Sequence, residues 1–254
     1  MKPETRNSKL AAIILAAGKG TRMKSSLAKV LHPLHGAPML SYSVNVARKV
    51  GASDIVAVVG HQAELIEETL KGEGLVFVRQ EAQLGTGHAV HQTRDLFRDF
   101  EGTILILCGD VPLLRPSTVE HLMEKHSAGQ ADVTVLTTRL DDPSGYGRIV
   151  KGEGDRILKI VEERDATAEE KGIREINTGI YCAECPFLFE AVAAIDNRNA
   201  QREYYLTDIV GIANRRNRTV RAFAVPDFQE VMGINTREDL KRAEDVIRRR
   251  GSGS

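Results

Sequence analysis

The segment that most restricts the fold of this chain lies at residues 10–31, where an apolar run passes into glycines and then into basic residues. Residues 11–15 are continuously apolar, which is typical of a strand buried on both faces of a parallel sheet, although periodicity alone also allows a short buried helix. Gly18 and Gly20 favour the strand, because they permit backbone torsions that a Cβ penalises and let main-chain N–H groups approach a ligand closely. The segment predicts a first strand followed by a phosphate-binding loop.

Basic side chains follow the glycines, and residues 10–31 contain no acidic one. A polyphosphate is the ligand that fits such a loop, whereas an ordinary glycine turn with a solvated basic loop is the alternative, since a glycine pair is a weak signal by itself. The loop is not a Walker A motif, because Gly20 stands where Ser or Thr is required. It is not a dinucleotide fingerprint either, because Met23 replaces the third glycine.

The composition excludes several classes of function. The 254 residues include 42% hydrophobic ones, enough for one large α/β domain, and 35 basic and 35 acidic residues give a formal net charge of zero. No global charge therefore points to nucleic acid or an anionic membrane. No apolar run approaches the roughly 18 residues of a membrane span, and residues 1–9 lack an apolar signal core. We expect a cytoplasmic protein that has small phosphorylated ligands and neither nucleic acid nor a membrane as a partner.

Apolar segments alternate between strand and helix patterns through the first half of the chain. Strands are expected at 55–60, 76–80 and 103–110, with helices at 39–50, 63–70 and 89–97. This alternation predicts an α/β fold with a Rossmann-like, doubly wound and mostly parallel sheet. Ligands of such sheets bind beyond the carboxyl ends of the strands, which is where Gly18, Gln80 and Asp110 fall.

The pattern changes in the second half of the chain. Two short alternating runs within residues 147–163 predict a β-hairpin, and a further strand is expected at 176–183. We therefore expect a small inserted β-rich lobe that binds the acceptor at about residues 141–215. No Pro-, Gly- or Ser-rich linker divides the chain, so we expect one domain at 10–250, between a mobile lead-in at 1–9 and a flexible tail at 251–254.

A series of sequence blocks resembles the signature of sugar-phosphate nucleotidylyltransferases. In particular it resembles the uridylyltransferase domains of the bacterial bifunctional N-acetylglucosamine-1-phosphate uridylyltransferase/glucosamine-1-phosphate acetyltransferases. The blocks, in order, are LAAGKGTRM with KVLH at 15–32, QLGTGHA at 83–89, GDVPLL at 109–114, DDPSGYGRI at 141–149, INTGIY at 176–181, EYYLTDIV at 203–210 and GINTRED at 233–239. Each block is moderately specific, and the ordered set, which covers residues 10–250, is much more so.

This resemblance implies Mg²⁺-dependent transfer of UMP from UTP to N-acetylglucosamine-1-phosphate. The products would be UDP-N-acetylglucosamine, a precursor of peptidoglycan and lipopolysaccharide, and pyrophosphate. The acceptor phosphate would attack the α-phosphate directly and in line. One alternative is the same chemistry with another sugar-1-phosphate or another nucleotide. The other is a catalytically silent protein that binds a nucleotide sugar.

Asp110 and Asn235 are the expected metal ligands. Asp110 ends an apolar strand, where a carboxylate is costly to bury without a cation or hydrogen-bond donors, and Mg²⁺ shared with nucleotide phosphates is a suitable partner. The alternative is an aspartate that caps the next helix. The resemblance pairs Asp110 with Asn235, which by itself could equally be a helix N-cap or a turn residue.

The resemblance also assigns the residues that bind the nucleotide and neutralise its charge. Arg22 would hold the triphosphate and Lys29 would neutralise the reacting phosphates as the catalytic pair, whereas a surface lysine is the alternative for Lys29. Gln80, Gly85 and Thr86 would contact the uracil, with strand-end or turn chemistry as the alternative. The full nucleotide-binding set is Leu15, Ala16, Ala17, Gly18, Lys19, Gly20, Gln80, Gly85 and Thr86.

A third set of residues is expected to contact the amino sugar through carboxylate, amide and hydroxyl groups. By resemblance these are Gly147, Glu162, Asn177, Tyr205 and Thr207. Glu162 could instead be the solvated end of a strand. Metal ligation by His88 and His91, which are spaced for packing or capping on a helix, is not expected. Nor is it expected at the isolated C-x-x-C pair of Cys182 and Cys185.

The sequence departs from the resembled family at three places. Ala28 stands where proline usually precedes the lysine, and Cys108 where a tyrosine is common. The hexapeptide-repeat β-helix of the bifunctional enzymes has no counterpart in the sequence. We therefore expect no acetyltransferase activity, and a monomer or weak oligomer instead of the trimer that the β-helix builds.

Overall fold

The structure, a computed structural model, describes residues 9–251. The expected lead-in and tail therefore lie outside the described residues, apart from Lys9, which begins the first strand, and Gly251, which ends the last helix. Within this range no helix is both long and apolar enough to cross a membrane.

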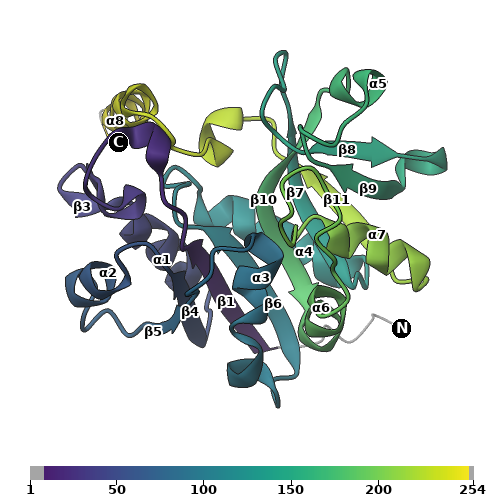
Figure 1. Cartoon of the computed structure of the whole chain (residues 1–254), viewed down its shortest axis with the longest axis horizontal. Coiled ribbons are helices and arrows are strands. Elements are labelled where there is room, and N and C mark those ends of the chain that lie inside the picture. The colour runs from purple at the N-terminus through teal and green to yellow at the C-terminus, as the bar shows by residue number, and fades with distance from the viewer. Residues whose placement is uncertain (1–8, 252–254) are drawn as a thin grey trace.

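A mixed sheet forms the centre of the molecule (Figure 1). Seven of its strands lie in the order β11-β7-β10-β6-β1-β4-β5, and β8 and β9 continue it beyond β10. All neighbours in the row pair in parallel except at β10, which is antiparallel to both β6 and β7. The predicted mostly parallel sheet is confirmed. Its strands are β1 (Lys9–Ala16), β4 (Asp54–Val59), β5 (Val76–Arg79), β6 (Gly102–Cys108), β7 (Val133–Arg139), β8 (Arg148–Lys151), β9 (Ile157–Val161), β10 (Glu175–Glu184) and β11 (Val220–Ala224).

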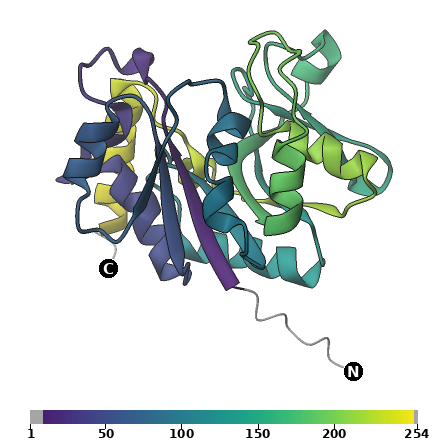
Figure 2. The same ribbon diagram turned by 60° about the horizontal axis from the view of Figure 1, so that its bottom comes forward.

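Helices cover both faces of the sheet, as Figures 1 and 2 show from two directions. Successive side chains of β1 alternate between two apolar clusters, with Ala11 and Ile13 in one and Ala12 and Ile14 in the other. The first cluster is completed by α3 (Thr86–His91), α6 (Cys185–Val192) and α7 (Asp208–Arg215), and the second by α1 (Met39–Lys49), α2 (Ala63–Thr69) and α4 (Pro116–Ala128). A strand buried on both faces explains the uninterrupted apolar run from which it forms.

The predicted hairpin is present as β8 and β9, which pair antiparallel and form a lobe with α5 (Ala168–Lys171). This lobe stands to one side of the central sheet (Figure 1). β10 belongs to both parts, because Ile176 pairs with Arg148 of β8 while residues 181–184 pair with β6. Its ladder with β7 is interrupted between Asn177 and Tyr181. The sequence predicted the strand but not its place between the two parts.

The C-terminal segment returns to the first loop of the chain. Helix α8 (Arg237–Gly251) packs beside the small hairpin of β2 (Pro33–Leu34) and β3 (Ala37–Pro38). A third apolar cluster joins them and includes Leu34, Met39, Leu113, Ile234, Ala243 and Val246. The first and last parts of the described chain therefore lie side by side, as their purple and yellow colours show in Figure 1.

Candidate active site

The loop after β1 has a buried first part and a tip that is exposed to solvent. Ala16 and Ala17 are buried, whereas Gly18 and Lys19 are exposed. Gly20 has a φ of 61°, and a Cβ there would come within 2.5 Å of the Cβ of Lys29. A glycine is therefore required where the loop passes over Lys29.

Two glutamines that the sequence analysis missed hold this loop in place. Gln62 accepts a hydrogen bond from the N–H of Ala28 at 2.7 Å and donates to the carbonyl oxygen of Ser26 at 2.6 Å. Gln83 donates to the carbonyl oxygen of Ala17 at 2.9 Å. Gln83 lies within the QLGTGHA block, but no sequence pattern marks Gln62.

Four side chains from distant segments converge beside the loop. The Nζ of Lys29 lies 2.5 Å from Oδ2 of Asp110 and 3.1 Å from Oδ1 of Asn235. The Nη2 of Arg22 donates to the same Oδ1 of Asn235 at 2.9 Å. The structure thus brings together the predicted catalytic and metal-binding residues.

Backbone hydrogen bonds fix the positions of the two oxygen-bearing side chains. The N–H of Gly109 donates to the carbonyl oxygen of Leu15 at 2.9 Å, which joins the ends of β6 and β1 and brings Asp110 to the loop. The N–H of Ile234 donates to the carbonyl oxygen of Asp110 at 2.8 Å. The amide nitrogen of Asn235 donates to the carbonyl oxygen of Gly233, so its Oδ1 faces the cations.

Neither of the two residues is a helix cap. Helix α4 begins at Pro116 without a side-chain cap, so Asp110 does not cap it. At α8 the hydroxyl of Thr236 accepts from the N–H of Asp239, whose carboxylate accepts from the N–H groups of Thr236 and Asn235. The side chain of Asn235 is therefore left for the site.

The oxygens of Asp110 and Asn235 form a donor set that suits a hard cation. Both lie within hydrogen-bond distance of one ammonium nitrogen, so they converge on a common point. Among residues 9–251, no group of three or more His, Cys, Asp or Glu side chains could hold a metal ion. The pair fits a Mg²⁺ ion whose remaining ligands are substrate oxygens and water.

A second loop, ahead of α3, holds the residues expected to contact the base. Buried Gln80 donates to the carbonyl oxygen of Gly85 at 3.0 Å. Gly85 has a φ of 111°, and a Cβ there would lie 2.6 Å from the carbonyl oxygen of Tyr204. The hydroxyl of Thr86 accepts a hydrogen bond from the N–H of Leu206 at 3.0 Å, so it supports the loop internally.

Four of the residues predicted to bind the sugar lie together in the lobe. Thr207 donates to Oε1 of Glu162 at 3.0 Å, and a Cβ on Gly147 would lie 3.5 Å from that carboxylate. The N–H of Asn177 donates to the carbonyl oxygen of Gly147 at 2.8 Å. Glu162 directly follows β9 and is partly buried. Burial raises the pKa of this carboxyl group, and the hydrogen bond from Thr207 opposes that shift.

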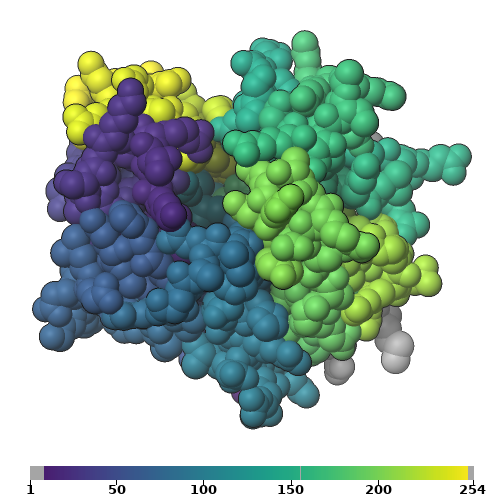
Figure 3. All heavy atoms as spheres, viewed as in Figure 1, coloured from purple at the N-terminus to yellow at the C-terminus, as the bar shows by residue number. Residues whose placement is uncertain are grey.

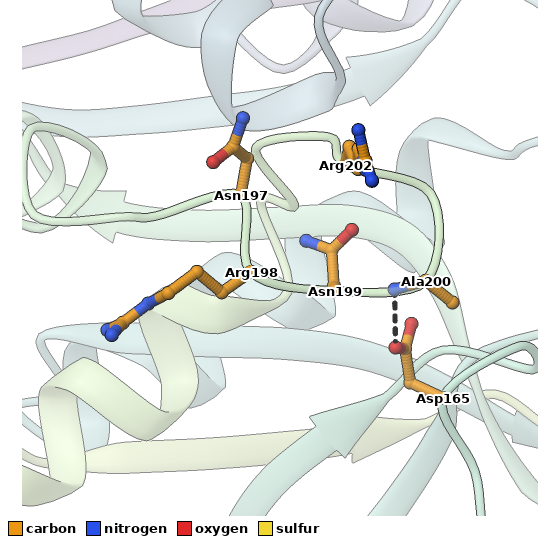
Figure 4. A pocket seen from close by; sticks show the side chains of 6 residues that line it. All are labelled: Asp165, Asn197, Arg198, Asn199, Ala200 and Arg202. Carbon is orange, nitrogen blue, oxygen red and sulfur yellow. Dashed lines mark hydrogen bonds between the residues drawn. The ribbon is translucent and has the colours of Figure 1, made fainter.

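The fifth residue, Tyr205, is buried and donates from its hydroxyl to Oδ2 of Asp165 at 3.2 Å. Tyr205, Glu162 and Thr207 are among the residues that line a cavity of about 350 Å³. A neighbouring, more open depression of about 610 Å³ lies under the loop at residues 197–202 (Figure 4). Asp165 also lines this depression and accepts a hydrogen bond from the N–H of Ala200 at 2.8 Å.

A cleft separates the glycine loop and α8 from the lobe, as the space-filling view in Figure 3 shows. Tyr146, which the sequence analysis missed, lies close to the charges of this region. Burial and the carboxylates of Asp239 and Asp110 raise the pKa of its hydroxyl, and Arg22 lowers it. Its ring meets that of Phe228 edge to face, with centroids 6.1 Å apart.

Cys108 ends β6, two residues before Asp110. Its thiol donates to the carbonyl oxygen of Gly179 at 3.4 Å. Burial, with the Asp110 carboxylate nearby, raises the pKa of the thiol to about 12, so the thiolate required for nucleophilic chemistry is scarce at neutral pH.

Comparisons with known proteins agree with this fold. A solved UDP-glucose pyrophosphorylase in complex with UDP-glucose superimposes with a TM-score of 0.75 at 20% identity, covering 96% of this chain and 99% of that one. A putative glucose-1-phosphate thymidylyltransferase from Bacillus anthracis superimposes with a TM-score of 0.70, also at 20% identity, covering 93% of this chain and 94% of that one. At this identity the likeness shows the fold alone.

Sequence comparison gives much nearer relatives. The bifunctional proteins GlmU of Geobacter metallireducens and Geobacter sulfurreducens are 57% and 54% identical over 242 residues. Each match covers 95% of this chain and 51% of the relative, so the chain spans about half the length of these curated relatives. The model of the MobA-like NTP transferase domain matches residues 12–201. The chain belongs to the family of MobA-like NTP transferase domains.

Proposed function

We propose that this chain transfers UMP from UTP to N-acetylglucosamine-1-phosphate, releasing pyrophosphate and UDP-N-acetylglucosamine. The observation that carries the proposal is the convergence of Arg22, Lys29, Asp110 and Asn235 beside the glycine loop. The identity to bifunctional GlmU proteins supports the uridylyl donor and the amino-sugar acceptor. Because UTP is a cytoplasmic nucleotide, the reaction would take place in the cytoplasm.

The glycine loop is proposed to bind the triphosphate. Its exposed tip, at Gly18 and Lys19, offers main-chain N–H groups and positive charge, and Arg22 adds a guanidinium group. Lys29 is poised to exchange its contact with Asp110 for the reacting phosphates. Phosphoryl transfer of this kind depends on positioning and charge neutralisation, so no covalent intermediate is needed. The acceptor phosphate is already ionised, so no general base is required.

Asp110 and Asn235 are proposed to hold Mg²⁺. When bound, the ion would neutralise the charge on the nucleotide phosphates. The two residues supply one carboxylate and one amide oxygen, in keeping with magnesium sites that share the ion with substrate phosphates.

The base is proposed to bind at Gln80, Gly85 and Thr86, and the amino sugar at Gly147, Glu162, Asn177, Tyr205 and Thr207. We further propose one catalytic domain at residues 10–250, with the acceptor lobe at about 141–215 and a monomeric or weakly associated state. The cleft between the glycine loop and the lobe would give the acceptor phosphate an approach to the nucleotide (Figure 3).

The test is pyrophosphate release with Mg²⁺ across a panel of four nucleoside triphosphates and several sugar-1-phosphates. We expect UTP with N-acetylglucosamine-1-phosphate to give the highest kcat/KM. If another pair of nucleoside triphosphate and sugar-1-phosphate gave the highest kcat/KM, the proposed substrates would be wrong, but the proposed nucleotidyl transfer would stand. A folded protein that binds UDP-N-acetylglucosamine without turnover of any pair would contradict the enzymatic proposal.

Asp110→Ala separates catalysis from binding. Loss of the carboxylate should lower kcat by about 10²–10³-fold, the size typical of a lost electrostatic contact in a transition state. The matched control is Asp54→Ala, at the exposed amino end of β4 and so at the opposite end of the parallel strands from Asp110, which should retain full turnover. Equal activity of the Asp110 variant and the wild type would exclude a metal at this position.

A further inference from the structure

The turn between β4 and α2, at residues 60–62, contacts the glycine loop at both of its ends. The N–H of His61 donates to the carbonyl oxygen of Ala17 at 3.3 Å, where the loop leaves β1. Gln62 contacts the other end of the loop, in the segment just before Lys29. The residues between these two contacts are mostly exposed. One turn therefore holds the loop where it begins and where it ends.

The amide of Gln62 bridges two peptide groups in a single orientation. Its oxygen accepts from the N–H of Ala28 at 2.7 Å, and its nitrogen donates to the carbonyl oxygen of Ser26 at 2.6 Å. A backbone N–H only donates and a carbonyl oxygen only accepts, so a flipped amide would make neither bond. These two bonds, the Gln62 tether, fix the two successive peptide groups that lead to Ala28 and then to Lys29.

Gln62 makes these contacts from a backbone conformation that is unfavourable for most side chains. Its φ of 56° lies in the left-handed region, which glycine adopts readily and a residue with a Cβ does not. Gln62 precedes α2 without capping it through its side chain, so capping does not explain the glutamine. The tether is the contact that compensates for the conformation.

The position of Lys29 depends on this segment. The carbonyl oxygen of Ala28 accepts from the N–H of Leu31 at 2.9 Å and so begins the short 3₁₀ helix η2 (Lys29–Leu31). Val30 and Leu31 are buried and anchor the later part of η2, so the tether acts at its beginning. A shift of Ala28 therefore moves the ammonium group of Lys29, which lies 2.5 Å from Asp110.

We propose that Gln62 is a positioning residue for Lys29: its amide fixes the backbone at Ser26 and Ala28, and thereby the point from which the ammonium group of Lys29 meets the reacting phosphates. This inference rests on the proposed role of Lys29 and deepens it. Charge neutralisation in phosphoryl transfer depends on where the cation lies, so a displaced Lys29 lowers the rate even when the nucleotide still binds.

Gln62→Gly removes the tether without straining the backbone, because glycine adopts the left-handed conformation readily. Relief of that conformation offsets part of the lost hydrogen bonding, so we expect little change in melting temperature. The kcat for UTP with N-acetylglucosamine-1-phosphate should fall about tenfold, since a 1 Å misplacement of a catalytic group can cost about a hundredfold. The KM for UTP should rise by a smaller factor.

Gln130→Gly is the matched control for the same substitution. Gln130 also has a positive φ, of 43°, and it is exposed. Among residues 9–251 its side chain makes no hydrogen bond. The variant therefore changes the backbone in the same way without removing a tether, and it should keep the wild-type kcat.

A proline at position 28 tests whether the two positions act together. Ala28 has a φ of −52°, within the range that a proline ring imposes, so proline can hold this backbone without a partner. In Ala28→Pro alone, the ring replaces the N–H and collides with the Gln62 oxygen, so kcat should fall. In Ala28→Pro/Gln62→Gly the ring has room, and most of the wild-type kcat should return.

Three results in these kinetics would overturn the inference. They are a wild-type kcat in Gln62→Gly, an equal loss of kcat in Gln130→Gly, and a double variant no faster than Gln62→Gly. Recovery in the double variant supports it, because a merely structural role of Gln62 predicts no gain in kcat from a second substitution.

A second measurement is independent of turnover. In the full chain, amide hydrogen exchange at Ala28 should be slow in the wild type and in Gln130→Gly, and faster in Gln62→Gly. Equally slow exchange in Gln62→Gly would overturn the inference even in an active enzyme. If no substrate pair turns over, but Gln62→Gly frees this amide and raises the dissociation constant of UTP in Mg²⁺ while Gln130→Gly does neither, the proposed reaction is refuted and the role of Gln62 stands.

Discussion

At the scale of single residues, the carboxylates of Asp110 and Glu162 differ in their surroundings. Asp110 has the ammonium of Lys29 2.5 Å away, whereas Glu162 has only the hydroxyl of Thr207 at 3.0 Å. The remaining neighbours of Glu162 include the carboxylates of Asp208 and Asp165. The charge of Asp110 is therefore compensated by a cation, whereas the charge of Glu162 is not compensated by the groups that shift its pKa.

The pH dependence of stability should reflect this difference at Glu162. Burial raises its pKa above the ordinary value of 4.5, so the folded state holds a proton that the unfolded state has already released. The contribution of this group to stability is therefore full below pH 4.5 and is lost as the pH rises through the raised folded value. Glu162→Gln lacks the ionisation and should be more stable than the wild type at neutral pH, but not at acidic pH. Chemical unfolding at both pH values measures this.

Its neighbour Glu163 provides a control of opposite sign. The hydrogen bond from Arg148 lowers the pKa of Glu163, so its contribution is present above pH 4.5 and disappears as the pH falls through the lowered value. Glu163→Gln should therefore be less stable than the wild type at neutral pH, with a smaller difference in acid. If the stabilities of Glu162→Gln and Glu163→Gln changed with pH in the same direction relative to the wild type, the two carboxyl groups would not have pKa values shifted in opposite directions.

At the scale of structural elements, the loop after β1 makes different demands on its two glycines. Gly20 has a positive φ and no room for a Cβ beside Lys29, while a Cβ on Gly18 would meet no atom within 4 Å. Gly20→Ala should lower both the melting temperature and kcat, because it strains the backbone and displaces Lys29. Gly18→Ala should leave the melting temperature unchanged and weaken only nucleotide binding, because its methyl group would fill space in the proposed phosphate site.

Thermal unfolding and titration with UTP, carried out on both variants, distinguish these effects. Equal losses of nucleotide affinity and of melting temperature in the two variants would mean that neither glycine has the specific role assigned to it.

Elements were predictable from the sequence where local patterns determine them. The apolar run at β1, the glycine turn behind it and the β8–β9 hairpin follow from residue spacing alone. The antiparallel position of β10 was not predictable, because an alternating strand looks the same in either direction and its neighbours are chosen by distant contacts. Gln62 was missed for a related reason, since its contacts with residues 26 and 28 have no counterpart in local spacing.

At the scale of the whole molecule, the site depends on the third apolar cluster. That cluster joins α8 to the hairpin of β2 and β3, and it contains Ile234, the residue before Asn235. The sequence resemblance suggested that Asn235 belongs to the site, but only this packing explains how a residue so late in the chain reaches Lys29.

Ile234→Ala should therefore affect both stability and catalysis. The side chain is fully buried, so its truncation should lower the free energy of unfolding by about 2–5 kcal/mol, and the loosened segment should move Asn235 and reduce kcat. Val246→Ala, in the same cluster but on α8, should cost stability and leave kcat unchanged. Denaturant unfolding and single-turnover rates of the two variants measure these effects. A similar kcat in both variants would show that Ile234 does not position Asn235 for catalysis.

The interruption in the β7–β10 ladder has a mechanical consequence. Asn177 and Tyr181 lie on either side of it, and Gly179, with a φ of 79°, lies between them. Since β10 is shared by the large sheet and the lobe, these two parts cannot swing apart as separate bodies without breaking a continuous strand. We expect any rotation of the lobe against the large sheet to bend β10 at these few residues, which would then set how the two parts of the proposed site face each other.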